Sequence, residues 1–230
     1  MQIYGLNKTT LLDYPGLVAS TVFTGSCNFR CPFCQNADLV LNPFSQPLIS
    51  QEEVFSHFDK RKSVVKGVCI TGGEPTLQKD LIDFIRKLKE KDLKVKLDTN
   101  GYQPDVIKII TEEKLVDYFA MDIKSALATY DMACGIICDT KRIEESIRLI
   151  MNSGIDYEFR TTVVRELHNE DTFKEIAETI RGAKQYFLQG YKDSERVIER
   201  RFSAYSKEEM LKFVPILSKN IEKVAIRGLD

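Results

Sequence analysis

Short apolar stretches alternate with longer amphipathic ones along most of the chain. The short stretches are rich in β-branched residues and tend to stop at turn residues, which is typical of buried strands. The longer stretches repeat their apolar positions every three to four residues, as helices with one buried face do. The expected strands are 17–24, 66–75, 93–101, 116–124, 155–164, 183–190 and 222–228, and the expected helices are 50–61, 80–92, 103–114, 139–154, 169–182 and 206–220.

This alternation predicts βαβ units and therefore an α/β fold with a mainly parallel sheet. Two helix ends support it: Ser50 and Glu53 have the spacing of a capping box, and Gly154 stands where a helix should end. Seven strands suit either a closed barrel or a partial, open one. Because the chain has no repeat, low-complexity tract or linker, we expect one domain over residues 1–230.

Composition and charge exclude several classes of function. The formal net charge is -1, without the clustered excess of Lys and Arg that nucleic-acid binding needs. The most basic segment, 195–202, interleaves its arginines with glutamates, so we expect a solvated helix face there. No apolar run approaches the ~20 residues that span a bilayer, and residues 1–16 lack an export signal. We therefore expect a cytoplasmic protein that binds neither nucleic acid nor membrane.

Polar residues of unusual type fall where the expected strands end. The carboxyl ends of parallel strands share one rim, and functional residues collect there. The features at successive strand ends are a cysteine-rich loop, Gly-Gly-Glu-Pro (72–75), Asp-Thr-Asn-Gly (98–101), Met-Asp-Ile-Lys (121–124), Arg160 and Gln189. We expect these side chains to meet at one site.

Three of the six cysteines, Cys27, Cys31 and Cys34, lie within eight residues. In a reducing cytosol, clustered thiols hold metal more often than they pair as disulfides. A structural zinc site needs four ligands, and neither His57 nor His168 is near in sequence. Three thiolates around a four-iron cluster would leave one iron free to bind a substrate or cofactor. A zinc knuckle completed by a distant cysteine is the alternative.

The spacing Cys27-x3-Cys31-x2-Cys34, with Phe33 before the last cysteine, resembles the signature of radical S-adenosylmethionine enzymes. Thr-Gly-Gly-Glu-Pro (71–75) resembles the family segment that holds the methionine part of that cofactor. The resemblance spans most of the chain and implies a partial, open parallel β/α barrel of six to seven strands. It also implies one [4Fe-4S] cluster, whose free iron binds S-adenosylmethionine and whose electron releases a 5'-deoxyadenosyl radical.

Several residues near these motifs suit that cofactor. Gly72 and Gly73 let the backbone turn sharply and approach a ligand closely. Glu74, together with backbone carbonyls, would receive the ammonium of the methionine part. Phe33 offers a flat face for the adenine, although a packing role is an equal alternative.

The opening of the chain, up to residue 36, resembles the activating enzymes of glycyl-radical enzymes, and most closely those of anaerobic ribonucleoside-triphosphate reductase. The resemblance implies that acidic residues lie near the cofactor, with a monovalent cation among them, and that basic residues pair with its carboxylate and ribose. For Asp98 a capped turn is an equal alternative. The residues near the cofactor would be Asp98, Thr99 and Asp122, and the basic residues would be Lys124 and Arg160. Gln189 is a further candidate for the pocket.

The expected activity is anaerobic removal of a hydrogen atom from a glycine of a partner glycyl-radical enzyme, and the expected partner is anaerobic ribonucleotide reductase. A flavodoxin or ferredoxin would reduce the cluster. One alternative is a radical enzyme acting on a small molecule, similar to the deazapurine synthases; another is a non-catalytic metal-binding module. Cys69 is expected in the core. Cys134 and Cys138 depart from the family pattern and are expected to be ordinary buried or half-buried cysteines, with a redox or metal role as the alternative.

Overall fold

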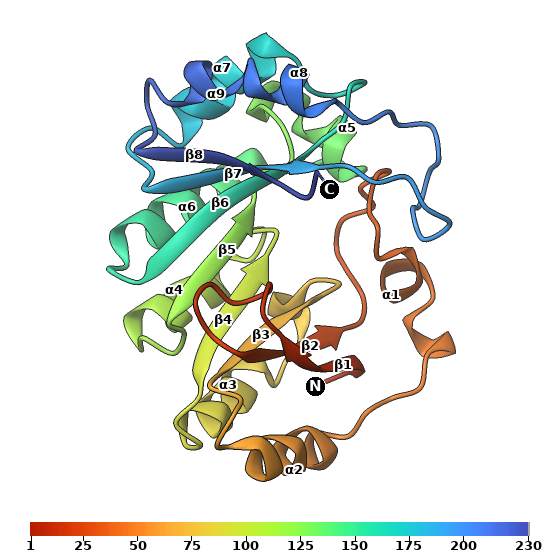
Figure 1. The fold of residues 1–230 in the computed structure, drawn as a ribbon, viewed down its shortest axis with the longest axis vertical. Helices are drawn as coiled ribbons and strands as arrows, with labels where there is room; N and C mark the ends of the chain where they lie inside the picture. Colours follow the sequence, from red (N-terminus) through yellow and green to blue (C-terminus); the bar gives the residue numbers. More distant parts are fainter. Residues whose placement is uncertain (230) are drawn as a thin grey trace.

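The computed structural model describes residues 1–229 and contains one curved sheet of eight strands. The strands follow one another in sequence order; β1 and β2 are antiparallel, and every later pair is parallel. β1 and β8 do not pair over the described residues, so the barrel is open (Figure 1). The strands are β1 (Ile3–Thr10), β2 (Ala19–Thr24), β3 (Gly67–Gly72), β4 (Lys94–Thr99), β5 (Tyr118–Asp122), β6 (Asp156–Val163), β7 (Gln185–Gly190) and β8 (Lys223–Arg227).

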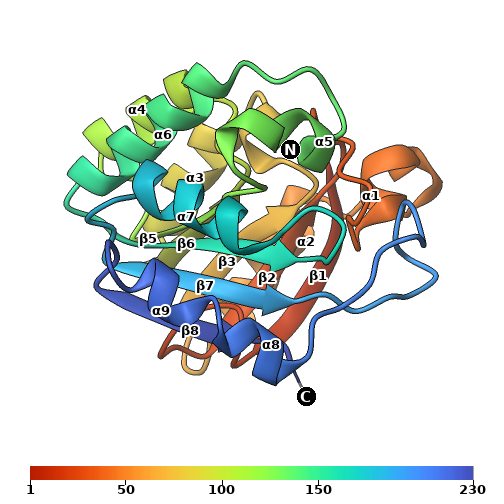
Figure 2. The ribbon, with the colours of Figure 1, turned by 90° about the horizontal axis from the view of Figure 1, so that it is seen from above.

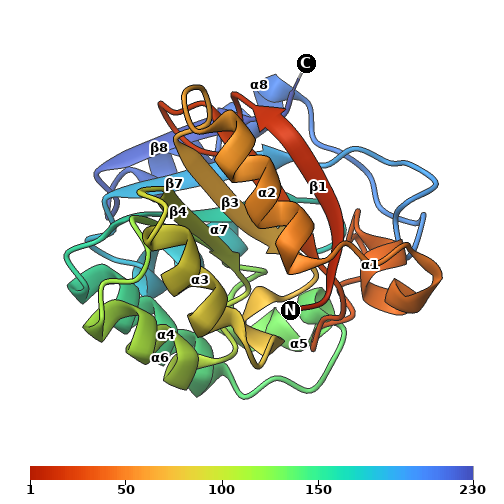
Figure 3. The same ribbon diagram turned by 90° about the horizontal axis from the view of Figure 1, so that it is seen from below.

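Most helices cover the outer side of the curved sheet, as the views from above and below show (Figures 2 and 3). α1 and α5 stand apart from that layer, toward the end of the sheet where the cysteine-rich loop lies (Figure 1). The helices are α1 (Ala37–Leu41), α2 (Gln51–Arg61), α3 (Leu81–Lys89), α4 (Pro104–Glu112), α5 (Tyr130–Cys134), α6 (Thr140–Asn152), α7 (Glu170–Thr179), α8 (Lys207–Leu211) and α9 (Val214–Leu217).

Amphipathic spacing and capping explain the long helices. In α6, Ile143, Ile147 and Ile150 recur on one face and are buried. The side chain of Ser50 accepts a hydrogen bond from the backbone N–H of Glu53 at the start of α2, as its position predicts. No helix within residues 1–229 is long and apolar enough to cross a membrane.

The predicted parallel strands are confirmed, and the open α/β barrel with them, but three expectations need correction. β1 was not predicted, because it is a partly exposed edge strand with a mixed polar sequence. The expected helix 206–220 is two short helices, since Pro215 in the first turn of α9 has no N–H to continue the ladder. Segment 195–202 is not helical; it runs as an irregular connection between β7 and α8.

Candidate functional site

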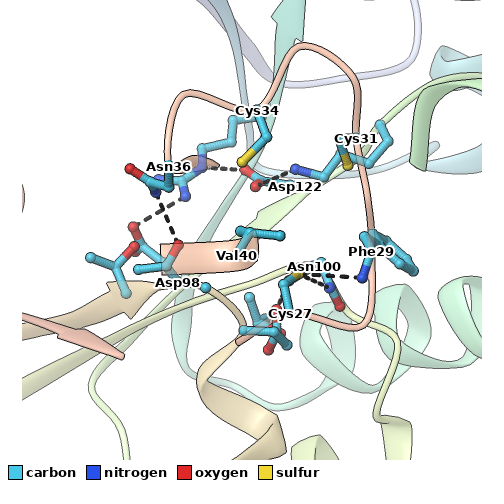
Figure 4. A pocket seen from close by; sticks show the side chains of 16 residues that line it. Cys27, Phe29, Cys31, Cys34, Asn36, Val40, Asp98, Asn100 and Asp122 are labelled. Atoms are coloured by element: carbon cyan, nitrogen blue, oxygen red, sulfur yellow. Dashed lines mark hydrogen bonds and ion pairs between the residues drawn. The ribbon is translucent and has the colours of Figure 1, made fainter. Parts of the chain in front are cut away.

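A cavity of about 570 Å³, counting its open mouth, lies at the rim where β3 to β6 end (Figure 4). The loop of residues 27–34, called the cysteine loop below, forms one wall. All the residues that the sequence predicted for the site line this cavity, except Phe33 and Gln189. The lining residues among them are Cys27, Cys31, Cys34, Gly72, Gly73, Glu74, Asp98, Thr99, Asp122, Lys124 and Arg160.

The two exceptions take other places. Phe33 is 4% exposed, and its ring meets those of His168 and Phe202 edge-on, at centroid distances of 6.3 and 6.0 Å. Phe33 therefore packs between these rings outside the cavity lining, and its expected contact with the adenine stays a prediction. Gln189 lies on β7 opposite Arg227 of β8 and does not reach the cavity lining.

Distant parts of the chain hold the cysteine loop through backbone hydrogen bonds. The N–H of Arg30 donates to the carbonyl of Cys134 at 2.8 Å. The N–H of Glu199 donates to the carbonyl of Pro32, also at 2.8 Å. Segment 195–202, expected to be a solvated helix face, thus covers part of the loop instead.

The three sulfurs border one cavity, yet no three His, Cys, Asp or Glu side chains among residues 1–229 are placed to hold a single metal ion. Three cysteine thiols at one cavity are the type of donor that an iron–sulfur cluster takes. Burial raises the pKa of the Cys27 and Cys31 thiols to about 12. A cluster bound there would therefore have to replace the thiol protons.

Beside Cys27, one polar group lacks a partner. The amide nitrogen Nδ2 of Asn28 is buried and has no hydrogen-bond acceptor in the part of the chain that is described. Its orientation is defined by Asn100, whose Nδ2 donates to Asn28 Oδ1 at 2.8 Å and whose own Oδ1 accepts from the N–H of Tyr102 at 2.9 Å. An unmet donor next to a cysteine sulfur fits a bound group with acceptor atoms, such as cluster sulfide.

A row of side chains with alternating charge crosses the ends of β4, β5 and β6; Figure 4 labels its two aspartates, Asp98 and Asp122. Arg160 bridges two carboxylates: its Nη2 lies 3.1 Å from Asp98 Oδ2, and its Nε lies 2.5 Å from Asp122 Oδ1. Lys124 Nζ lies 2.8 Å from the other oxygen of Asp122, and Lys96 pairs with Asp98. The order of the row is thus lysine, aspartate, arginine, aspartate, lysine.

These contacts keep the row ionised. Burial alone would raise the pKa of Asp122, but the charges of Arg160 and Lys124 outweigh it and hold that pKa well below its usual range. Burial alone would lower the pKa of Lys124, and the carboxylate of Asp122 outweighs that effect and raises it. A monovalent cation between Asp98 and Asp122 would have to displace the Arg160 guanidinium, so this geometry does not favour the expected cation.

Replacing Arg160 with methionine is expected to lower the free energy of unfolding by about 3 kcal/mol. The change would leave the buried Asp98 and the half-buried Asp122 without their shared partner. Urea unfolding followed by circular dichroism measures the loss. Arg148→Met is the matched control, because Arg148 is exposed and forms its ion pair with Glu145 on the surface of α6, so its replacement should not change the stability. An Arg160→Met protein as stable as the parent would contradict the claim that the charge row stabilises the fold.

Gly72 and Gly73 bring two strand ends into close contact. Gly72 has a φ of +111°, and the N–H of Gly73 donates to the carbonyl of Thr24 at 2.8 Å. A Cβ atom on Gly73 would lie 1.9 Å from the carbonyl oxygen of Ser26. These glycines therefore allow the end of β3 to come close to the backbone of Ser26, just before Cys27.

Glu74 ties this segment to the end of β4. It is 1% exposed, and one carboxylate oxygen accepts hydrogen bonds from the N–H and hydroxyl of Thr76 and from the hydroxyl of Thr99. The other oxygen accepts from the N–H of Asn100 at 2.7 Å. Burial raises the pKa of Glu74. Both oxygens are already engaged, so the ammonium contact expected of Glu74 stays a prediction.

Two asparagines of the cavity were missed. Asn100 lines it beside Cys27, with Nδ2 3.8 Å from the sulfur (Figure 4). Asn36 lines it too, and its Nδ2 donates to the carbonyl of Gly72 at 2.9 Å. Asn100 belongs to the Asp-Thr-Asn-Gly turn, where turn chemistry already explained its presence. If every polar residue in the motifs at the strand ends had been included as a candidate, both asparagines would have been predicted.

The sequence is similar to known proteins of one family. The family described as the Radical SAM superfamily matches residues 21–181. A Methanocaldococcus jannaschii protein, described as a candidate glycyl-radical enzyme activating enzyme, is 30% identical over 235 residues, covering 99% of this chain and 96% of that protein. The 7-carboxy-7-deazaguanine synthase of Thermoplasma acidophilum is 26% identical over 149 residues, covering 64% and 66%.

One solved structure extends the comparison to the fold. Streptococcus suis SuiB bound to S-adenosylmethionine matches with a TM-score of 0.71 at 14% identity, over 92% of this chain. The match covers 52% of SuiB, so the chain spans about half of that protein's length. At this identity the likeness concerns the open barrel alone.

Proposed function

Because the chain belongs to the Radical SAM superfamily, we propose that it cleaves S-adenosylmethionine reductively and removes a hydrogen atom from a glycine of a partner glycyl-radical enzyme. The observation that carries the proposal is the convergence of three cysteines with Lys124 and Arg160 in one cavity. The similarity over nearly the whole chain to a candidate activating enzyme supports the protein substrate.

Cys27, Cys31 and Cys34 would hold a [4Fe-4S] cluster with one iron left open. When bound, the cluster and S-adenosylmethionine supply the electron transfer and the radical chemistry. Lys124 and Arg160 would offer charged donors to the carboxylate and ribose of the cofactor, as cations do for anionic oxygens. The chain itself keeps these two residues ionised and oriented through Asp122.

Two segments of the chain would help to exclude water when the partner is docked. The cysteine loop forms one wall of the cavity, and segment 195–202 lies against that loop through backbone hydrogen bonds. Exclusion of water and thiols protects a carbon radical from side reactions. For the partner we propose anaerobic ribonucleotide reductase, and for the electron donor a flavodoxin or ferredoxin, on the resemblance of the opening segment.

The partner is tested by electron paramagnetic resonance. We expect the cluster-loaded protein, reduced and mixed with S-adenosylmethionine and an anaerobic ribonucleotide reductase, to produce the doublet signal of a glycyl radical. A reductase variant with its radical-site glycine replaced by alanine is the control and should give no signal. Cleavage of S-adenosylmethionine without any glycyl radical would contradict the proposed substrate.

A small-molecule radical enzyme is the second candidate. It rests on the partial similarity to 7-carboxy-7-deazaguanine synthase, which covers about two thirds of each chain. The two candidates differ in one result: only the second predicts that a purine precursor, rather than a protein, raises the rate of S-adenosylmethionine cleavage.

A further inference from the structure

Cys134 and Cys138 lie side by side at the end of α5, outside the cavity lining. The helix ends at Cys134, and Gly135 follows in the left-handed conformation, with a φ of 70°, which turns the chain back. Asp131 Oδ1 then accepts a hydrogen bond from the N–H of Cys138 at 2.9 Å, which holds residue 138 against the last turn of the helix. The Cys134 thiol donates to the carbonyl of Ile136 at 3.4 Å, and it lies within interaction range of the Cys138 thiol.

The two thiols differ in exposure. Cys134 is fully buried, whereas Cys138 is half-buried and follows Ile137, which is 93% exposed. A small oxidant can thus reach Cys138, and the partner thiol is already in contact with it. The contact between the two thiols lowers the pKa of Cys134 to about 7 and, together with burial, raises the pKa of Cys138, so the two thiols titrate as a pair.

Other roles for this pair fit less well. A metal site needs more ligands, and residues 1–229 contain no group of three His, Cys, Asp or Glu side chains placed for an ion. An inert core role suits Cys69, which is 1% exposed and lies on β3 with its sulfur 3.5 Å from Asp98. It does not suit Cys138, which is half-buried and lies close to the Cys134 thiol.

We propose that Cys134 and Cys138 form a redox-active dithiol, which a disulfide of low molecular mass oxidises to an intramolecular disulfide. One thiolate of the pair attacks a sulfur of glutathione disulfide and releases one glutathione. The second thiol displaces the other glutathione, so that two protein thiols lose two electrons and two protons and two glutathione thiols form. The proposal does not depend on the proposed function.

The position of the dithiol links it to the cysteine loop. The carbonyl of Cys134 accepts the N–H of Arg30, next to Cys31. The contact is close, because a Cβ atom on Gly135 would lie 2.2 Å from the Arg30 carbonyl oxygen. A change in the turn at Gly135 therefore reaches the loop through direct backbone contact.

Mass spectrometry tests the proposal on the full-length protein under anoxic conditions. The protein is incubated with glutathione disulfide, quenched with acid, alkylated with N-ethylmaleimide and digested with trypsin. Both cysteines fall in one tryptic peptide, 125–141, because no Lys or Arg lies between Lys124 and Lys141. We expect this peptide to lose both alkyl groups and to be two hydrogen atoms lighter than its reduced form. Peptide 67–79, which contains Cys69, should stay fully alkylated.

Two variants identify the roles of the thiols. In Cys134→Ser the reaction should stop with glutathione attached to Cys138, whereas in Cys138→Ser the buried Cys134 should be modified at least tenfold less. The mass of peptide 125–141 from the wild-type protein tests the proposed disulfide even if a variant does not fold. Peptide 125–141 with both cysteines still alkylated, or with glutathione retained on one of them, would overturn the proposal.

Discussion

Cys31→Ala is expected to abolish both cluster binding and cleavage of S-adenosylmethionine. Cys31 is 6% exposed and borders the cavity together with Cys27 and Cys34. With only three cysteines at the cavity, no fourth sulfur from the lining can replace the lost ligand. Iron and sulfide analysis after anaerobic reconstitution measures the first loss, and 5'-deoxyadenosine formation measures the second.

Cys138→Ala is the matched control for this experiment. It removes a half-buried thiol that does not line the cavity, so under reducing conditions iron content and cleavage should equal those of the parent. A Cys31→Ala protein that still binds four irons and cleaves the cofactor would show that the cysteine loop is not the cluster ligand.

Gly73→Ala is expected to destabilise the fold by about 3 kcal/mol and to impair cluster binding. The added Cβ atom would lie 1.9 Å from the oxygen and 2.7 Å from the carbon of the Ser26 carbonyl. Both are backbone atoms, so the contact is relieved only if the chain moves directly beside Cys27. Urea unfolding and iron content after reconstitution measure the two effects.

Gly154→Ala separates this steric effect from backbone strain. Gly154 follows α6 with a φ of +72°, and a Cβ atom there would meet nothing within 4 Å. We expect a cost of about 1 kcal/mol from the left-handed conformation alone, with unchanged iron content. Equal losses in the two variants would contradict the close approach of Gly73 to Ser26.

The parallel part of the fold could be predicted from the sequence, because β2 to β8 consist of apolar segments joined by helices. β1 could not, since an edge strand with one open side needs no apolar run. The break between α8 and α9 could in principle be predicted from Pro215. The course of segment 195–202 was not, because its contacts with the cysteine loop use backbone atoms, which leave no trace in residue type.

Much of the candidate site was also predictable, because its residues stand at strand ends that share one rim. What each residue does was harder to infer. Glu74 was expected to face a ligand but hydrogen-bonds within the chain, and Arg160 was expected to meet the cofactor but already bridges Asp98 and Asp122. Such pairings join side chains far apart in sequence, so spacing alone cannot reveal them.

The central claim is that three cysteines hold a cluster whose open iron binds S-adenosylmethionine. Its most direct test is product analysis of the reconstituted wild-type protein with dithionite and S-adenosylmethionine under strict anoxia. The account predicts methionine and 5'-deoxyadenosine in equal amounts. A protein with a complete complement of iron and sulfide that leaves S-adenosylmethionine intact would contradict it.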